Sequence, residues 1–201
     1  MKHVAVAITG ASGAVYGLRL VEELLKQGCR VSLLVSGAGR QVLALEQQLN
    51  WPEETKAFEQ QARDYFNVED EQLCCYAEQD FTAPVASGSA AADAMVVIPA
   101  SMGSVGRIAC ALSSNLIERV ADVMLKERRR LIMVPRETPL NTLHLQNLLT
   151  LSQAGAVILP AMPAFYSQPQ SLDDLVNFVV GKVLDSLGLT HALFTRWGED
   201  S

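Results

Sequence analysis

The chain lacks the features that would place it in several large protein classes. It has four cysteines, Cys29, Cys74, Cys75 and Cys110, without C-x-x-C spacing, so neither a zinc site nor a disulfide framework is indicated. No run of about 18 apolar residues predicts a membrane span. The apolar stretch that follows Met1 is too short for the core of a signal peptide. We therefore expect a cytoplasmic protein with reduced cysteines.

Basic residues are too few and too scattered to follow a nucleic-acid backbone. Residues 51–80 hold nine acidic and two basic residues, which accounts for the whole net charge of −6, and the rest of the chain is nearly neutral. The run of three arginines at residues 128–130 fits a solvated helix end, where cations interact favourably with the helix dipole. DNA and RNA binding are therefore disfavoured.

What the chain does have is apolar residues in strand and helix patterns. Hydrophobic residues make up 49% of its 201 residues, and the mean hydropathy is +0.17. This length suits one domain with a sizeable core. So high an apolar content indicates strands buried on both faces and a large interface between subunits. We expect a homo-oligomer.

Strand and helix patterns alternate along the chain. Strands are expected at residues 4–8, 31–35, 94–98, 131–134 and 156–159, with a short one at 74–77. Helices are expected at residues 15–26 and 40–48, from 104 to about 110, from 116 to 127, and at 141–154 and 172–187. This alternation predicts an α/β fold, a Rossmann-like or flavodoxin-like doubly wound parallel sheet in one domain over residues 1–201.

The first turn of this pattern is rich in small residues. Residues 9–17 read TGASGAVYG and lie between the first strand and the first helix. Small residues let backbone N–H groups and the positive end of a helix close on an anion. The spacing Gly10-x-x-Gly13-x-x-x-Gly17 differs from the dinucleotide motif G-x-G-x-x-G. We interpret the turn as a cradle for the phosphate of a nucleotide or flavin.

Other loops at the same edge of the sheet carry hydroxyl groups rather than the acid that NAD requires. Ser36 and Gly37 follow the second strand, where an Asp or Glu would hold the ribose. No tyrosine has a lysine four residues further on, so the Tyr-x-x-x-Lys pair of short-chain dehydrogenases is absent. A hydroxyl-lined pocket for a monophosphate is the better interpretation, and FMN is the natural candidate.

Six separated motifs then occur in one order along the chain. They are TGASGA at 9–14, PVASGS at 84–89, NLIER with AD at 115–122, LKERR at 125–129, VPRETP at 134–139, and PAFY with QPQS at 163–171. Together they resemble the UbiX-type flavin prenyltransferases. The resemblance implies a flavodoxin-like fold, a dodecamer, and transfer of the dimethylallyl group of dimethylallyl monophosphate to N5 and C6 of reduced FMN. The product, prenylated FMN, serves UbiD-type decarboxylases, including that of ubiquinone biosynthesis.

The resemblance also assigns residues. Those matching FMN-binding positions are Gly10, Ala11, Ser12, Ser36, Ser87, Ser101, Met102, Gly103, Ser104 and Arg119. Those matching the positions around dimethylallyl phosphate are Lys126, Arg136, Glu137, Tyr166 and Lys182. The catalytic positions are Ser12 and Glu46, a pair that moves a proton near N5 with Glu46 from a neighbouring subunit, together with Lys126 and Glu137.

The chemistry of these residues agrees with the assignment. Breaking an allylic C–O bond develops charge on the departing phosphate, and fixed cations and a tyrosine hydroxyl stabilise such charge. No metal is then required, and Asp173 and Asp174 fit first-turn helix acids after a Ser171 cap rather than a magnesium motif. Two positions depart from better-known members: Lys182 replaces an arginine, which loses a two-pronged contact, and Phe81 replaces a tryptophan.

Two other functions remain open on the sequence. A flavin-dependent cysteine-type decarboxylase of the same fold would use a catalytic histidine and a PASANT motif. This chain has ASGS at 86–89 and no histidine between His3 and His144. A non-catalytic FMN carrier would not need the set of Lys126, Arg136, Tyr166 and Lys182. Trp197 covers either the pocket or an interface, and no role is assigned to residues 51–80.

Overall fold

The apolar runs form the parallel strands of one sheet. The computed structural model describes residues 2–68, 71–166 and 168–198. The strands are β1 (His3–Ile8), β2 (Arg30–Val35), β3 (Leu73–Tyr76), β4 (Ala94–Ala100), β5 (Arg130–Pro135) and β6 (Val157–Ile158). All their pairings are parallel, in the order β3-β2-β1-β4-β5-β6. This is the 3-2-1-4-5-6 order of doubly wound nucleotide-binding folds, so the predicted fold class is confirmed.

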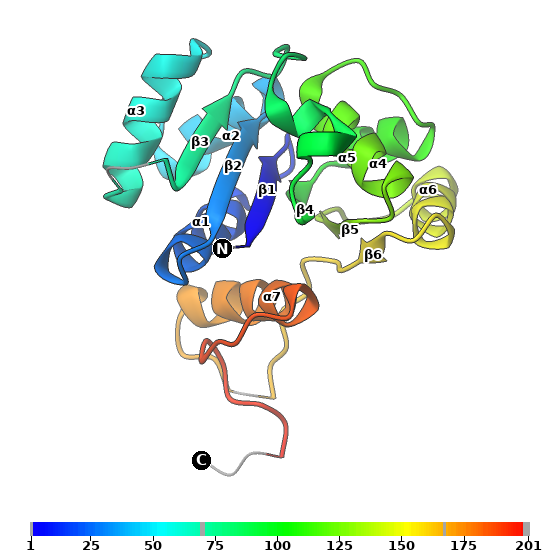
Figure 1. Cartoon of the computed structure of the whole chain (residues 1–201). Helices are drawn as coiled ribbons and strands as arrows, with labels where there is room; N and C mark the ends of the chain where they lie inside the picture. Colours follow the sequence, from blue (N-terminus) through cyan, green and yellow to red (C-terminus); the bar gives the residue numbers. More distant parts are fainter. Residues whose placement is uncertain (1, 69–70, 167, 199–201) are drawn as a thin grey trace.

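Helices cover both faces of the sheet (Figure 1). Side chains of α1 (Ala14–Lys26), α2 (Gly37–Gln47), α3 (Thr55–Phe66) and α7 (Leu172–Leu187) share one apolar core with one face. Those of α4 (Met102–Ala109), α5 (Leu116–Lys126) and α6 (Thr142–Gln153) share a second core with the other face, joined by the short turn η1 (Pro84–Ala86). A second turn, η2 (Gly88–Ala90), follows η1. Every residue of β4 is buried, as expected of a central strand covered on both faces.

Most expected elements are present with small shifts at their ends. The short strand expected at 74–77 is real and pairs with β2. β4 continues two residues past the expected end because Ala100 still pairs with Pro135 of β5. α2 begins at Gly37 rather than residue 40, because the Ser36 hydroxyl accepts a hydrogen bond from the Gly39 N–H and caps the helix. No helix among the described residues is both long and apolar enough to cross a bilayer.

The solvated helix end predicted for residues 128–130 is wrong for its middle residue. Arg129 donates hydrogen bonds to the carbonyls of Ala91 and Ala92, at 2.6 and 2.8 Å. Arg128 has a positive φ of 53° and follows α5, and Arg130 is already the first residue of β5. Arg129 therefore ties the loop before β4 to the end of α5, a role that a charge run in sequence does not reveal.

Candidate active site

The site lies at the carboxyl ends of β1 and β4, where the strand order reverses. Ligands of doubly wound sheets bind at this switch point. The buried Thr9 joins the two strand ends: its hydroxyl donates to the Pro99 carbonyl and accepts from the Ser101 N–H, each at 2.8 Å. The small-residue turn after β1 and the hydroxyl loop after β4 are thereby held as one unit.

Two helices that begin at this edge are capped by serines predicted to bind FMN. Ser36 caps α2, and Ser101 caps α4 by accepting from the Ser104 N–H at 3.2 Å. The Ser101 hydroxyl also donates to that of Ser104, at 3.0 Å. The first turn of α4 brings Met102 and Gly103 to the same place. Hydroxyls and helix N-termini together favour a bound anion.

The N-terminus of α1 is already occupied by a carboxylate of the same chain. Glu46, near the end of α2, accepts hydrogen bonds from the N–H groups of Gly13 and Ala14, at 2.9 and 3.0 Å. This turn therefore holds the chain's own Glu46 carboxylate, and the phosphate cradle stays a prediction. Within one chain Glu46 already reaches Ser12, and its expected role at the site of a neighbouring subunit stays a prediction as well.

The ionised form of Glu46 is stabilised by its surroundings. Burial raises its pKa, but hydrogen bonds from the Ser12 hydroxyl and from the Gly13 and Ala14 N–H groups, together with the charge of Arg136, lower it more. The net pKa lies below the ordinary value for glutamate. Ser12 and Glu46 are therefore a hydrogen-bonded hydroxyl and carboxylate, as the predicted proton-moving pair requires.

Arg136, at the end of β5, completes this group. Its Nε donates to the Ser12 carbonyl at 2.9 Å. Glu137 follows it, with its carboxylate bound to the Thr138 N–H at 3.0 Å. A cavity of about 430 Å³ opens beside them. Its polar lining residues include Ser12, Glu46, Gln47 and Arg136, and its apolar ones Val15, Tyr16, Ala161, Pro163, Leu172, Leu175 and Val176.

The chemistry of this cavity fits a flavin ring. Apolar walls suit the flat aromatic system, and the hydroxyl, carboxylate and guanidinium at the rim suit its polar edge. Two glycines beside the cavity also permit close approach of the backbone. A Cβ at Gly10 would overlap Ala38, and one at Gly39 would lie 2.5 Å from the Ile8 carbonyl oxygen. No side chain larger than hydrogen fits there, so α2 can approach the end of β1 closely.

Glu78 bridges the starts of α2 and α5, whereas Arg119 and Ser87 lie further along α5: a Cβ at Gly88, next to Ser87, would meet the Glu127 carboxylate that follows that helix. The Glu78 carboxylate accepts from the Gly37 N–H at 2.8 Å, and its carbonyl accepts from the Leu116 N–H at 2.7 Å. The N-termini of α2 and α5 therefore meet. Arg119, one turn into α5, donates to the Ala86 carbonyl at 3.2 Å, next to Ser87, and pairs with Asp122 at 3.4 Å.

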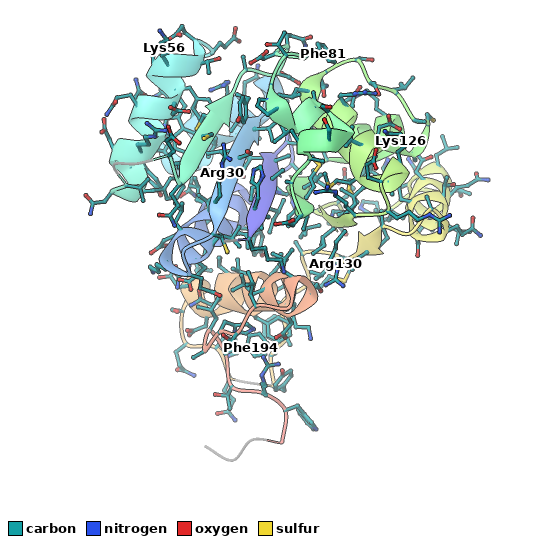
Figure 2. The ribbon with its side chains drawn as sticks, viewed as in Figure 1. Arg30, Lys56, Phe81, Lys126, Arg130 and Phe194 are labelled. Carbon is teal, nitrogen blue, oxygen red and sulfur yellow. The ribbon has the colours of Figure 1, made fainter. Side chains whose placement is uncertain are left out.

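Lys126 is not part of this group within one chain. It ends α5, whose C-terminus leads into the start of β5, whereas Ser12 and Arg136 follow the ends of strands. In a parallel α/β fold these positions lie at opposite edges of the sheet. The Lys126 ammonium pairs with the neighbouring Glu127 at 2.5 Å. Figure 2 shows it on α5, on the side of the molecule that carries α4 and α6.

Tyr166 and Lys182 form a third group on the outer face of α7. The Tyr166 ring meets that of Phe178 edge-on, with 6.0 Å between centroids, and Phe178 precedes Lys182 by one helical turn. Trp197 packs edge-on against Tyr166 at 5.1 Å and is 80% exposed. Within one chain, Trp197 therefore contacts Tyr166, a residue predicted to bind the substrate.

A buried acid near the site escaped the sequence analysis. Glu118 in α5 is 1% exposed, and its carboxylate accepts from Arg107 Nε at 2.5 Å and from the Ser114 N–H at 2.8 Å. Arg107 also reaches the Ser104 hydroxyl, at 3.4 Å. The spacing Asn115-x-x-Glu118 at a helix start resembles a capping box and was the available signal.

The fold and this site define a flavoprotein of the doubly wound α/β class. The sequence profile of the Flavoprotein family matches residues 1–184. A flavin prenyltransferase UbiX from Halalkalibacterium halodurans is 51% identical over 195 residues, covering 97% of this chain and 93% of that one. The UbiX of Pseudomonas aeruginosa is 46% identical over 198 residues, covering 98% and 95%.

Solved structures agree. A crystal structure described as AnUbiX in complex with FMN and dimethylallyl pyrophosphate superposes with a TM-score of 0.88 at 36% identity, over 100% of this chain and 99% of that one. A dodecameric FMN-dependent UbiX-like decarboxylase from Escherichia coli O157:H7 gives 0.85 at 36%, over 97% and 98%. The chain belongs to the UbiX family of flavin prenyltransferases, as the sequence motifs indicated.

The cysteine-type decarboxylases are similar in fold alone. A PPC decarboxylase mutant gives a TM-score of 0.59 at 16% identity, over 94% of this chain. None of the three histidines of the chain lines the Ser12 cavity: His3 starts β1, His144 lies in the first turn of α6, and His191 contacts Asp185 of α7. A histidine-dependent decarboxylation at this cavity has no candidate residue.

Proposed function

We propose that the chain transfers the dimethylallyl group of a small allylic phosphate to N5 and C6 of reduced FMN. The observation that carries this proposal is the group of Ser12, Glu46 and Arg136 at the rim of an apolar cavity at the switch point. A hydroxyl and an ionised carboxylate can take a proton, and a fixed guanidinium can hold an anion. Reduced FMN supplies the nucleophilic atoms.

The flavin ring fits the cavity with its polar edge toward Ser12. The Glu46 carboxylate already takes the N–H groups at the start of α1, so a phosphate there would meet a like charge. We therefore place the flavin phosphate at the hydroxyl-capped starts of α2 and α4, beside Ser36, Ser101 and Ser104. Arg119 and Ser87, which the resemblance also assigns to FMN, remain candidates for contacts with the flavin.

Ser12 and Glu46 move the proton that leaves N5 when the new bond forms. Glu46 holds the Ser12 hydroxyl and is ionised near neutral pH, because its pKa is lowered. It can therefore accept a proton through that hydroxyl. Arg136, Lys126, Lys182 and Tyr166 stabilise the charge that develops on the departing phosphate, and Glu137 takes part in acid–base chemistry on that phosphate.

One chain does not bring all of these groups together, so we propose that each site is built from more than one subunit. Lys126 lies at the far edge of the sheet from Ser12, and Tyr166 and Lys182 lie on the outer face of α7. The E. coli relative is described as dodecameric. An assembly of this kind would place the α5 end of one subunit at the cavity of another.

Other parts of the proposal rest on the family. We expect a homododecamer in the cytoplasm, no requirement for metal, and a product that serves a UbiD-type decarboxylase such as that of ubiquinone biosynthesis. The monophosphate ester is proposed as the substrate. The AnUbiX complex contains the pyrophosphate, so both esters belong in the test.

The test is anaerobic incubation of the protein with reduced FMN and dimethylallyl monophosphate in the presence of a chelator. We expect the flavin to gain the mass of one five-carbon unit. The pyrophosphate, with and without magnesium, forms the parallel reaction. A flavin of unchanged mass in every reaction would defeat the proposal, and carbon dioxide release from an added cysteine peptide would favour the decarboxylase instead.

A further inference from the structure

The segment after α7 lies along the outer face of that helix (Figure 1). Gly181, in the middle of α7, makes room for it: a Cβ there would lie 2.5 Å from Phe194 Cε1 and 2.7 Å from His191 Cε1. Phe194 in turn packs against Phe178, with 4.9 Å between ring centroids. Figure 2 shows Phe194 beside α7. Residues 189–198 therefore pack against α7.

Asp185 is the charged centre of this contact. Arg196 grips its carboxylate with both terminal nitrogens, at 2.7 and 3.2 Å, and His191 Nε2 lies 3.2 Å from it. The Lys182 ammonium, one turn earlier on α7, also pairs with this carboxylate, at a longer distance of 3.8 Å. Hydrogen bonds from Arg196 outweigh the effect of burial and lower the pKa of Asp185. The carboxylate is ionised, and Arg196 is its best-placed cation.

Lys182 is thus the more weakly paired cation, and it lies on the outer face of α7, which also holds Tyr166. Trp197, next to Arg196 in sequence, packs on Tyr166. The Lys182 side chain is 49% exposed and the Asp185 side chain 24% exposed. A two-pronged guanidinium matches a carboxylate better than an ammonium does. As long as Arg196 binds Asp185, Lys182 is not required to neutralise that carboxylate.

We infer that Arg196 is a positioning residue for the allylic phosphate, because it occupies Asp185 and leaves the Lys182 ammonium to bind substrate. The inference rests on the proposed function, which places Lys182 at that phosphate. Without Arg196, the i,i+3 pair of Lys182 and Asp185 closes. The lysine is then shared with a carboxylate, so less of its positive charge is available to the phosphate.

The test measures binding of dimethylallyl monophosphate by calorimetry to protein that holds oxidised FMN, which lacks the N5 hydrogen and cannot be prenylated. We expect Arg196→Ala to weaken binding by about tenfold, as for loss of one charge-assisted hydrogen bond. Flavin affinity and thermal unfolding should stay close to those of the wild type. Arg196→Lys, which keeps the charge without the fork, should fall between the two.

The decisive variant is the double substitution Arg196→Ala with Asp185→Asn. Removing the carboxylate frees Lys182 again, so binding should return to the wild-type strength, and Asp185→Asn alone should bind at least as well. Lys26→Ala, which breaks a surface ion pair on α1, is the matched control and should change nothing.

Unchanged binding by Arg196→Ala would overturn the inference, and so would a double variant that stays weak, because Arg196 would then act by seating the segment. Absence of any binding by the wild type would overturn it as well. A wild-type protein that binds the ester but makes no heavier flavin would defeat only the proposed function, since this inference is read from the dissociation constant.

Discussion

At the scale of single residues, the site depends on one carboxylate at a helix start. Glu46 has a lowered pKa, so it favours the folded state when ionised, and that contribution is lost as pH falls through its folded pKa. Because this pKa lies below the ordinary value of 4.5, we predict that prenyl transfer by the wild type is kept down to about pH 4.5 and falls on further acidification. Glu46→Gln should be slower by about a hundredfold and should lack this acid limb.

The measurement is the rate of flavin mass gain across that range, together with thermal unfolding at each pH. Glu53→Gln removes an exposed acid of the segment 51–80 and should keep the wild-type profile. A Glu46→Gln enzyme with the same acid limb as the wild type would show that another group controls it.

Two neighbouring glycines provide a second residue-scale prediction. Gly39→Ala places a Cβ 2.5 Å from a backbone oxygen of Ile8, which cannot move aside, whereas Gly37→Ala meets nothing closer than the Glu78 carboxylate at 3.7 Å. We expect Gly39→Ala to lose about 2 kcal/mol of stability to urea and to bind FMN weakly. Gly37→Ala should behave like the wild type. Equal stability and flavin binding by both variants would contradict the close packing described here.

At the scale of elements, the last turn of α4 and the start of α5 are held together by a buried charge. The Glu118 carboxylate is bound by Arg107, Ser114 and Asn115, and Arg107 also reaches Ser104 in the first turn of α4. We predict that Glu118→Ala lowers the free energy of unfolding by about 3 kcal/mol and weakens FMN binding. Asn115→Ala, which removes the helix cap and one of the hydrogen bonds to Glu118 but keeps the carboxylate and Arg107, should cost about 1 kcal/mol.

Urea titration and fluorescence titration of FMN check this prediction. A Glu118→Ala protein that loses no more stability than Asn115→Ala would mean that the buried charge contributes little.

The elements themselves were predictable because strand and helix periodicity, caps and glycine turns act locally. Their ends were less so: β4 runs past Ile98 because of its pairing with β5, and pairing is not a local property.

At the scale of the whole molecule, the single chain leaves several large apolar side chains exposed. Leu45, Leu143, Phe165, Leu172 and Trp197 are between 68% and 84% exposed. Where such side chains lie together on one surface, they are candidates for burial between subunits. Together with the separation of Lys126 from Ser12, they support a site shared between subunits.

Mixing two inactive variants tests the shared site. Ser12→Ala and Lys126→Ala should each be inactive alone. If Ser12 and Lys126 of one site come from different chains, random co-assembly leaves both intact in about a quarter of the sites. We therefore expect activity to return to about a quarter of the wild-type rate after the variants are unfolded and reassembled together. No recovery from an assembly of wild-type size would place both residues in one chain.

Three properties could be predicted from the sequence: the class of the fold, the edge of the sheet at which the candidate residues gather, and the family. These follow from local chemistry: apolar periodicity, small residues after strands, serines before helices, and motifs whose order is written in the chain. The contacts of the folded chain were needed to show that Glu46 binds the turn before α1, that Glu118 is buried, that Arg196 and Lys182 both lie within ion-pair distance of Asp185, and that Lys126 lies at the far edge. Each of these depends on which side chains, distant in sequence, come into contact. Contact and burial are set by tertiary packing, and the order of residues along the chain does not specify which side chains pack together.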